Sequence, residues 1–142
     1  MKILGVSLGT KNGNNDTMCR VALEAAKAKG AEIEFIHLLD WDIQYCSGCV
    51  ACSRGLVMGK GMICSRQDDF KAFYEKVIEA DGVLFVDPIF ESGATGLYHS
   101  ITDRMGPGHD TGMMKMLDGK LKEAGKEAEA VFVSDMNIDE LK

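Results

Sequence analysis

Short apolar runs alternate with amphipathic, helix-forming segments along most of this chain, and this alternation limits the folds that the chain can adopt. The predicted strands are residues 2–7, 32–37, 83–86 and 130–133. The predicted helices cover about residues 16–29, 68–80, 97–104 and 115–129. Asn15 or Asp16 is the expected N-cap of the first helix. Strands and helices in this order form a parallel sheet with right-handed crossovers and helices on both faces, so we predict one α/β domain over residues 1–142.

Charge and composition exclude several classes of protein. The net charge of −6 disfavours a non-specific nucleic-acid binder. No apolar run approaches the length of a membrane span, and the N-terminus lacks the apolar segment and cleavage site of a signal peptide. We therefore expect a cytoplasmic protein with reduced thiols that binds neither nucleic acid nor membranes. The five cysteines then indicate metal or redox chemistry before structural disulfides.

Glycine, asparagine and hydroxyl side chains fill the turn between the first strand and the first helix. Ligands of parallel sheets bind at the carboxyl ends of the strands, where the strand order reverses. Backbone N–H groups in this turn, next to a helix N-terminus, suit a phosphate, although a plain solvated turn is the alternative. The turn has neither the G-x-G-x-x-G fingerprint nor a Walker motif. Candidate ligands are Ser7, Gly9, Thr10, Lys11, Asn12, Gly13, Asn14 and Thr17.

The loop after the third predicted strand is a second candidate for ligand contacts. Pro88 stiffens the exit from the strand, and Phe90 has the shape to pack beside a planar ring. The alternative is that Phe90 is simply an aromatic residue of the core. Candidate contact residues in this loop are Pro88, Ile89, Phe90, Glu91, Ser92, Gly93 and Ala94.

Four cysteines gather between the second predicted strand and the next helix, in a segment predicted as a loop over residues 39–67. Cys46, Cys49 and Cys52 form a C-x2-C-x2-C run, and Cys64 follows. This set suits the four thiolates of a [4Fe–4S] cluster, whereas zinc sites more often pair two separated C-x2-C knuckles. Free thiols, a zinc site and a dimer surface are the alternatives. Cys19 is expected to be a core residue of the first helix.

Three segments of the chain resemble one family. Residues 5–14 resemble the "G-x-S-G-S-P-R-K-x-G-N-T" phosphate loop of the NAD(P)H-dependent FMN reductases, and residues 87–96 resemble their "S-P-V-Y-x-x-x-x-S-G" loop. The cysteine run, with "C-x-x-x-D-D-M" matched at residues 64–70, is similar to the iron–sulfur flavoprotein branch. The resemblance implies a flavodoxin-like fold, an FMN with its phosphate in the first loop and its isoalloxazine ring against the second, and a [4Fe–4S] cluster on the four cysteines.

The resemblance also implies a function. We expect an FMN-binding, NAD(P)H-dependent oxidoreductase or electron-transfer iron–sulfur flavoprotein, which passes electrons to a redox partner protein or a small acceptor. One alternative is a cluster-free FMN reductase of quinones, nitro or azo compounds, and another is a truncated, non-catalytic subunit or metal-binding module. No side chain is assigned a catalytic role, because the flavin carries the chemistry. Asp87 stands where the family has a small hydroxyl residue, and a carboxylate there is expected to lower the flavin potential.

The C-terminal part of the fold is predicted to be short. The sequence continues for eight residues after Ser134, so we expect the fifth strand of a flavodoxin-like sheet to be missing. An unpaired edge of the fourth strand would favour aggregation. We therefore expect a homo-oligomer, or a partner chain that completes the sheet.

Overall fold

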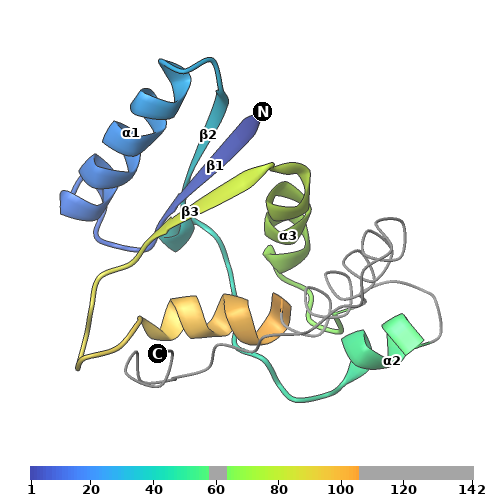
Figure 1. The fold of residues 1–142 in the computed structure, drawn as a ribbon. Helices are drawn as coiled ribbons and strands as arrows, with labels where there is room; N and C mark the ends of the chain where they lie inside the picture. The colour runs from blue at the N-terminus through green and yellow to red at the C-terminus, as the bar shows by residue number, and fades with distance from the viewer. Residues whose placement is uncertain (58–63, 106–142) are drawn as a thin grey trace, which may run out of the picture. The chain divides into compact units, whose positions relative to one another are not determined.

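Three parallel strands form the sheet in the order β2-β1-β3 (Figure 1). The computed structural model describes residues 1–57 and 64–105. The strands are β1 (Lys2–Ser7), β2 (Glu32–His37) and β3 (Gly82–Val86). β1 is central: its residues run in register from Lys2 opposite Glu32 on one side, and from Ile3 opposite Gly82 on the other. The first three predicted strands are confirmed, and the strand predicted at residues 130–133 lies outside the described residues.

Helices cover both faces of the sheet, as the alternation predicts. Helix α1 (Asn14–Lys27) packs on one face, where a Cβ added to Gly5 would lie 2.7 Å from the Cys19 sulfur and 2.7 Å from Leu23. Gly5 is therefore required for α1 to approach β1 this closely. Helix α3 (Phe70–Glu79) and a helix over residues 96–105 lie on the other face (Figure 1). The helix predicted at residues 115–129 lies outside the described residues.

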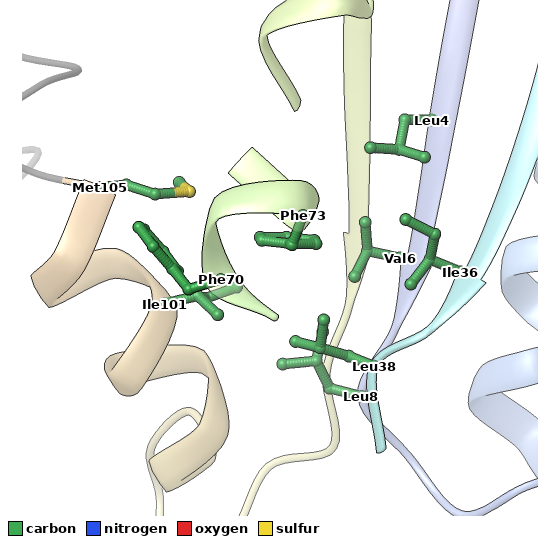
Figure 2. Packing of buried hydrophobic residues seen from close by; sticks show 9 residues of the cluster. All are labelled: Leu4, Val6, Leu8, Ile36, Leu38, Phe70, Phe73, Ile101 and Met105. Atoms are coloured by element: carbon green, nitrogen blue, oxygen red, sulfur yellow. The ribbon is translucent and has the colours of Figure 1, made fainter. Parts of the chain in front are cut away.

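The main apolar core lies between the sheet and these last two helices. Phe70 and Phe73 of α3 are fully buried, and Figure 2 shows Phe73 toward the sheet and Phe70 toward the helix 96–105. Ile101 and Met105 extend the core from that helix, so the sheet alone does not bury Phe70. The core cluster comprises Leu4, Val6, Leu8, Ile36, Leu38, Phe70, Phe73, Ile101 and Met105 (Figure 2).

Two local predictions are wrong. Helix α1 begins at Asn14 after Gly13, and its N-cap makes no side-chain hydrogen bond, so neither Asn15 nor Asp16 is the cap. The Asp16 carboxylate instead turns back under the preceding loop, where it accepts two hydrogen bonds. The segment 39–67 is also not all loop, because a short 3-10 turn (Leu38–Asp40) and helix α2 (Ala51–Val57) lie in it.

All described residues belong to one compact unit, Met1–Gly108. The prediction of one domain over residues 1–142 stays a prediction. In the described part of the chain, no helix combines the length and the apolar composition that a membrane crossing requires.

Candidate functional site

The loop from β1 into α1 (residues 8–13, the first loop) is closed by its own backbone. The Gly13 N–H donates to the Thr10 carbonyl at 3.0 Å, and Asn12 adopts a left-handed φ of 57°. A Cβ on Gly13 would lie 2.9 Å from the Thr10 carbonyl oxygen, and a Cβ on Gly9 would lie 2.7 Å from the Asn15 side chain. Both glycines are therefore needed for the tight path of the chain under the start of α1.

The buried side chain of Asp16 stabilises this loop through hydrogen bonds. Its carboxylate, 4% exposed, accepts hydrogen bonds from the Ser7 hydroxyl at 2.5 Å and from the Asn12 N–H at 2.7 Å. Burial alone would raise the pKa of Asp16, but these hydrogen bonds outweigh it and the pKa is lowered. The charge of Asp16 is thus satisfied within the protein. Ser7, a predicted ligand, is fully buried and uses its hydroxyl for this contact.

The solvent side of the first loop carries the other predicted ligands. Gly13 leaves the first N–H groups of α1 without a side-chain cap, which is the arrangement that an anion can occupy. Lys11 forms an ion pair with Asp40 in which both side chains are about half exposed. Such an exposed pair is weak, so Lys11 is available to a phosphate. The exposed residues here are Thr10, Lys11, Asn12, Asn14 and Thr17, and Gly9 is buried beneath them.

His37, which the sequence analysis did not single out, ends β2 beside this loop. The ring is 8% exposed, and its Nε2 lies 3.5 Å from the Asp16 carboxylate. Within the described residues, neither ring nitrogen has a hydrogen-bond partner. The sequence did offer a signal for His37, because it is the last residue of a predicted strand and so lies at the edge of the sheet where ligands bind.

The loop after β3 (residues 87–95, the β3 loop) lies next to the first loop. The Leu8 N–H donates to the Val86 carbonyl at 3.0 Å, which joins the two loops where they leave the sheet. Phe90 and Gly93 exchange backbone hydrogen bonds of 3.0 and 2.9 Å around a tight turn. Glu91 and Ser92, at its centre, have φ of 46° and 65°, which is the strained left-handed region for residues other than glycine.

Most side chains of the β3 loop, residues 89–94, are exposed. Ile89 is 79% exposed and Phe90 is 64% exposed, so Phe90 is not a core aromatic. Asp87 accepts hydrogen bonds from the Thr95 N–H at 2.8 Å and from the Thr95 hydroxyl at 2.7 Å. These bonds tie the strand end to the start of the helix 96–105. The predicted residues Pro88, Ile89, Phe90, Glu91, Ser92, Gly93 and Ala94 all lie in this loop, and all except the half-buried Pro88 are exposed.

The four predicted cluster ligands line one small pocket. This cysteine pocket is formed by Cys46, Ser47, Cys49, Val50, Cys52, Cys64, Arg66 and Arg104. Val50, with a left-handed φ of 52°, lies between the second and third cysteines of the run and is a backbone outlier for a β-branched residue. All four thiols are free, and Cys46 and Cys49 are exposed. The pocket thus presents unpaired thiols on a strained turn.

The donor set of the pocket is four thiols, a ligand type that both zinc and iron–sulfur clusters use. In residues 1–57 and 64–105, no three metal-binding side chains lie close enough together to hold one ion. Zinc, with Zn–S bonds of about 2.3 Å, would need its four sulfurs within about 4 Å of one another. A cubane spreads its four thiolate ligands farther apart around its faces, which suits cysteines that line a pocket. A hydrogen bond of 2.9 Å to Ser65 is the main cause that lowers the pKa of Cys49 to about 7, so this thiol readily supplies a thiolate.

A buried arginine, which the sequence analysis did not identify, closes the inner side of this pocket. Arg104 is 3% exposed and forms a two-pronged ion pair with Asp68, with Nη2 at 2.8 Å from Oδ1. It donates to the Gln44 carbonyl at 2.9 Å and to the Cys64 sulfur at 3.2 Å, and lies 4.0 Å over the Phe70 ring. Its hydrogen bonds lower the pKa of Asp68 to about 2. The signal in the sequence was a lone arginine near the end of a predicted helix, which is not specific.

The fold and the two joined loops define a flavodoxin-like α/β protein with its candidate site at the carboxyl ends of β1 and β3. A family model described as NADPH-dependent FMN reductase matches residues 1–121. The chain belongs to this family.

Individual relatives agree with this assignment. An iron–sulfur flavoprotein of Archaeoglobus fulgidus is 34% identical over 104 residues, which cover 73% of this chain and 48% of the relative. One from Methanocaldococcus jannaschii is 33% identical over 108 residues, covering 75% of this chain and 53% of the relative. The chain therefore spans about half the length of these curated relatives.

Solved structures show the same fold. A structure described as flavone reductase superposes with a TM-score of 0.64 at 42% identity, covering 92% of this chain and 38% of that one. RosB, solved with a bound intermediate, has a TM-score of 0.55 at 19% identity and covers 74% of this chain and 42% of that one, a likeness that concerns the fold alone.

Proposed function

We propose that this chain binds FMN at the first loop and the β3 loop and serves as an NAD(P)H-dependent flavin oxidoreductase of the iron–sulfur flavoprotein kind. The hydrogen bond between the Leu8 N–H and the Val86 carbonyl carries the proposal, because it joins the two loops that resemble the phosphate and ring contacts of the family. The names of the relatives, iron–sulfur flavoproteins and a flavone reductase, support the same chemistry.

The phosphate of FMN would lie against the start of α1. The uncapped N–H groups of the first turn, the exposed hydroxyl of Thr10 and the exposed amide of Asn12 are the donors on that side. Lys11 would exchange part of its contact with Asp40 for the phosphate charge. The buried carboxylate of Asp16 does not oppose this, because Ser7 and Asn12 already satisfy it.

The flavin ring would lie beside the β3 loop. Phe90 and Ile89 supply exposed apolar surface for one edge or face of a planar ring, and exposed residues 92–94 supply backbone groups. FMN bound there would supply the hydride and electron-transfer chemistry, while the protein would supply position and electrostatics. The turn at Glu91 and Ser92 would keep these groups in place before the ring arrives.

The cysteine pocket would hold a [4Fe–4S] cluster on Cys46, Cys49, Cys52 and Cys64. A cluster-free FMN reductase is the second candidate, favoured by the exposure of the free thiols of Cys46 and Cys49. Electrons would leave to a redox partner protein or a small acceptor.

We further propose a cytoplasmic location, which the free cysteines of the described residues support. We also propose a homo-oligomer, or a partner chain that completes the sheet, which light scattering can test.

Spectra and metal assays on protein purified without oxygen test the proposal. FMN, iron and zinc are measured on the same sample. Flavin bands with a broad brown shoulder and about four irons per chain support the iron–sulfur flavoprotein. Flavin without iron, before and after anaerobic reconstitution, supports the cluster-free reductase. A colourless protein that does not bind added FMN contradicts both and favours the non-catalytic subunit.

A further inference from the structure

The helix over residues 96–105 joins the β3 loop to the cysteine pocket. At its start, Thr95 donates two hydrogen bonds to Asp87 and its hydroxyl accepts one from the Tyr98 N–H at 3.2 Å. Near its end, Arg104 reaches Cys64. The nine residue steps from Thr95 to Arg104 span about 14 Å at a rise of about 1.5 Å per residue. One rigid helix therefore sets the distance between the two candidate cofactor sites.

The guanidinium of Arg104 is held through its two terminal nitrogens, whereas its buried Nε has no hydrogen-bond partner within the described residues. Asp68 holds it through two oxygens, the Gln44 carbonyl accepts a third hydrogen bond, and the Phe70 ring lies beneath it. The remaining contact within these described residues is the hydrogen bond from Nη2 to the Cys64 sulfur. A planar fork held this way is pre-organised and cannot be replaced by a lysine without loss of contacts.

We propose that Arg104 is a positioning residue for the cysteine pocket, which fixes Cys64 as a cluster ligand and stabilises the negative charge that reduction adds. This inference rests on the proposed cluster. Hydrogen bonds to ligand sulfurs and nearby charge set the potential of such clusters, and a cation that donates to a ligand sulfur raises it. Arg104 is 3% exposed, so solvent screens its charge little, while the ion pair with Asp68 offsets part of that charge.

Anaerobic redox titration separates this role from a merely structural one. Arg104→Gln removes the charge and the fork, Arg104→Lys keeps the charge, and Arg54→Gln makes the same charge change at an exposed position on α2. In iron-loaded Arg104→Gln, we expect the equilibrium constant for one-electron reduction of the cluster to fall about tenfold, equal to about 59 mV. Arg104→Lys should lie between this variant and the wild type, and Arg54→Gln should stay within about twofold of wild type. Equal potentials in Arg104→Gln and Arg54→Gln overturn the proposal.

The iron content of the same proteins is the second measurement. If Arg104→Gln and Arg104→Lys bind FMN normally but both lose iron that Arg54→Gln retains, the positioning of Cys64 is supported directly. If the wild type itself takes up no iron, the proposed cluster fails, and the charge-stabilising role fails with it. Amide hydrogen exchange of the metal-free chain then tests the positioning alone. We expect about tenfold faster exchange in Arg104→Gln at Gln44, whose N–H donates to Asp68, and an unchanged rate there overturns this part too.

Discussion

In the first loop, turns are closed by residues a few positions apart, whereas the cysteine pocket depends on contacts from distant parts of the chain. Asn12 bonds to Asp16 and Gly13 to Thr10. In contrast, Cys64 is held by Arg104, 40 positions later, and Arg104 also bonds to Gln44, 60 positions earlier. The first loop is therefore built in advance of its ligand, while the pocket depends on the packing of the whole α3 side of the sheet.

Removal of one cysteine is the most severe test of the pocket. Cys64→Ala should reduce iron from about four per chain to nearly none, because a cubane needs its fourth thiolate. Cys19→Ala is the matched control: Cys19 of α1 is buried against β1, away from the pocket, so iron should be retained while stability falls. Iron and sulfide assays after anaerobic reconstitution give the answer. Full iron content in Cys64→Ala would show that the four-cysteine assignment is wrong.

The first loop should be broken by a side chain at Gly13. Gly13→Val brings a Cβ to 2.9 Å from the Thr10 carbonyl oxygen, and the backbone has to move. We expect FMN affinity to fall about hundredfold, or about 2.7 kcal/mol, measured by fluorescence titration of the apoprotein. Gly96→Ala, where an added Cβ meets nothing within 4 Å in the described part of the chain, should bind FMN as wild type does. Equal FMN affinity in the two variants would show that the first loop does not contribute to FMN binding.

Acid should lower the stability of the protein through Asp68, which lies beside the cysteine pocket. Arg104 lowers the pKa of Asp68 to about 2 from a usual value of 3.8. A carboxyl with a lowered pKa in the folded protein contributes stability that is complete above its unfolded pKa and is lost as pH falls through its folded pKa. We expect a loss of about 2 kcal/mol in the free energy of unfolding between pH 5 and pH 2.

Urea denaturation of Asp68→Asn across the same pH range isolates this contribution. The variant should be less stable than wild type at pH 7, because it leaves the buried Arg104 without its charged partner. Its stability should then change less between pH 5 and pH 2 than that of the wild type. An identical pH dependence in the two proteins would mean that other carboxyls, such as Asp16, dominate acid unfolding.

The same contrast explains how much could be predicted from the sequence. β1 and β2 have the predicted bounds, because short apolar runs between turn residues define strands locally. The predicted N-cap of α1 was wrong because the Asp16 carboxylate accepts a hydrogen bond from the buried Ser7 hydroxyl and so stabilises the preceding loop. Helix α2 and the Arg104 contacts could not be predicted, since they depend on residues brought together only by packing.

The smallest expected effect is at Asp87, which links the two regions through the helix 96–105. Asp87→Ser removes the carboxylate that the sequence analysis expects to lower the flavin potential, together with two hydrogen bonds to Thr95. We expect a loss of about 1 kcal/mol in stability and a modest rise in the FMN midpoint potential. Thr95→Ala, which loses one hydroxyl bond but keeps the carboxylate, is the matched control. If the FMN midpoint potential of Asp87→Ser is unchanged, the role of Asp87 is limited to its hydrogen bonds with Thr95. If the potential rises in Asp87→Ser and not in Thr95→Ala, the negative charge of Asp87 is the cause.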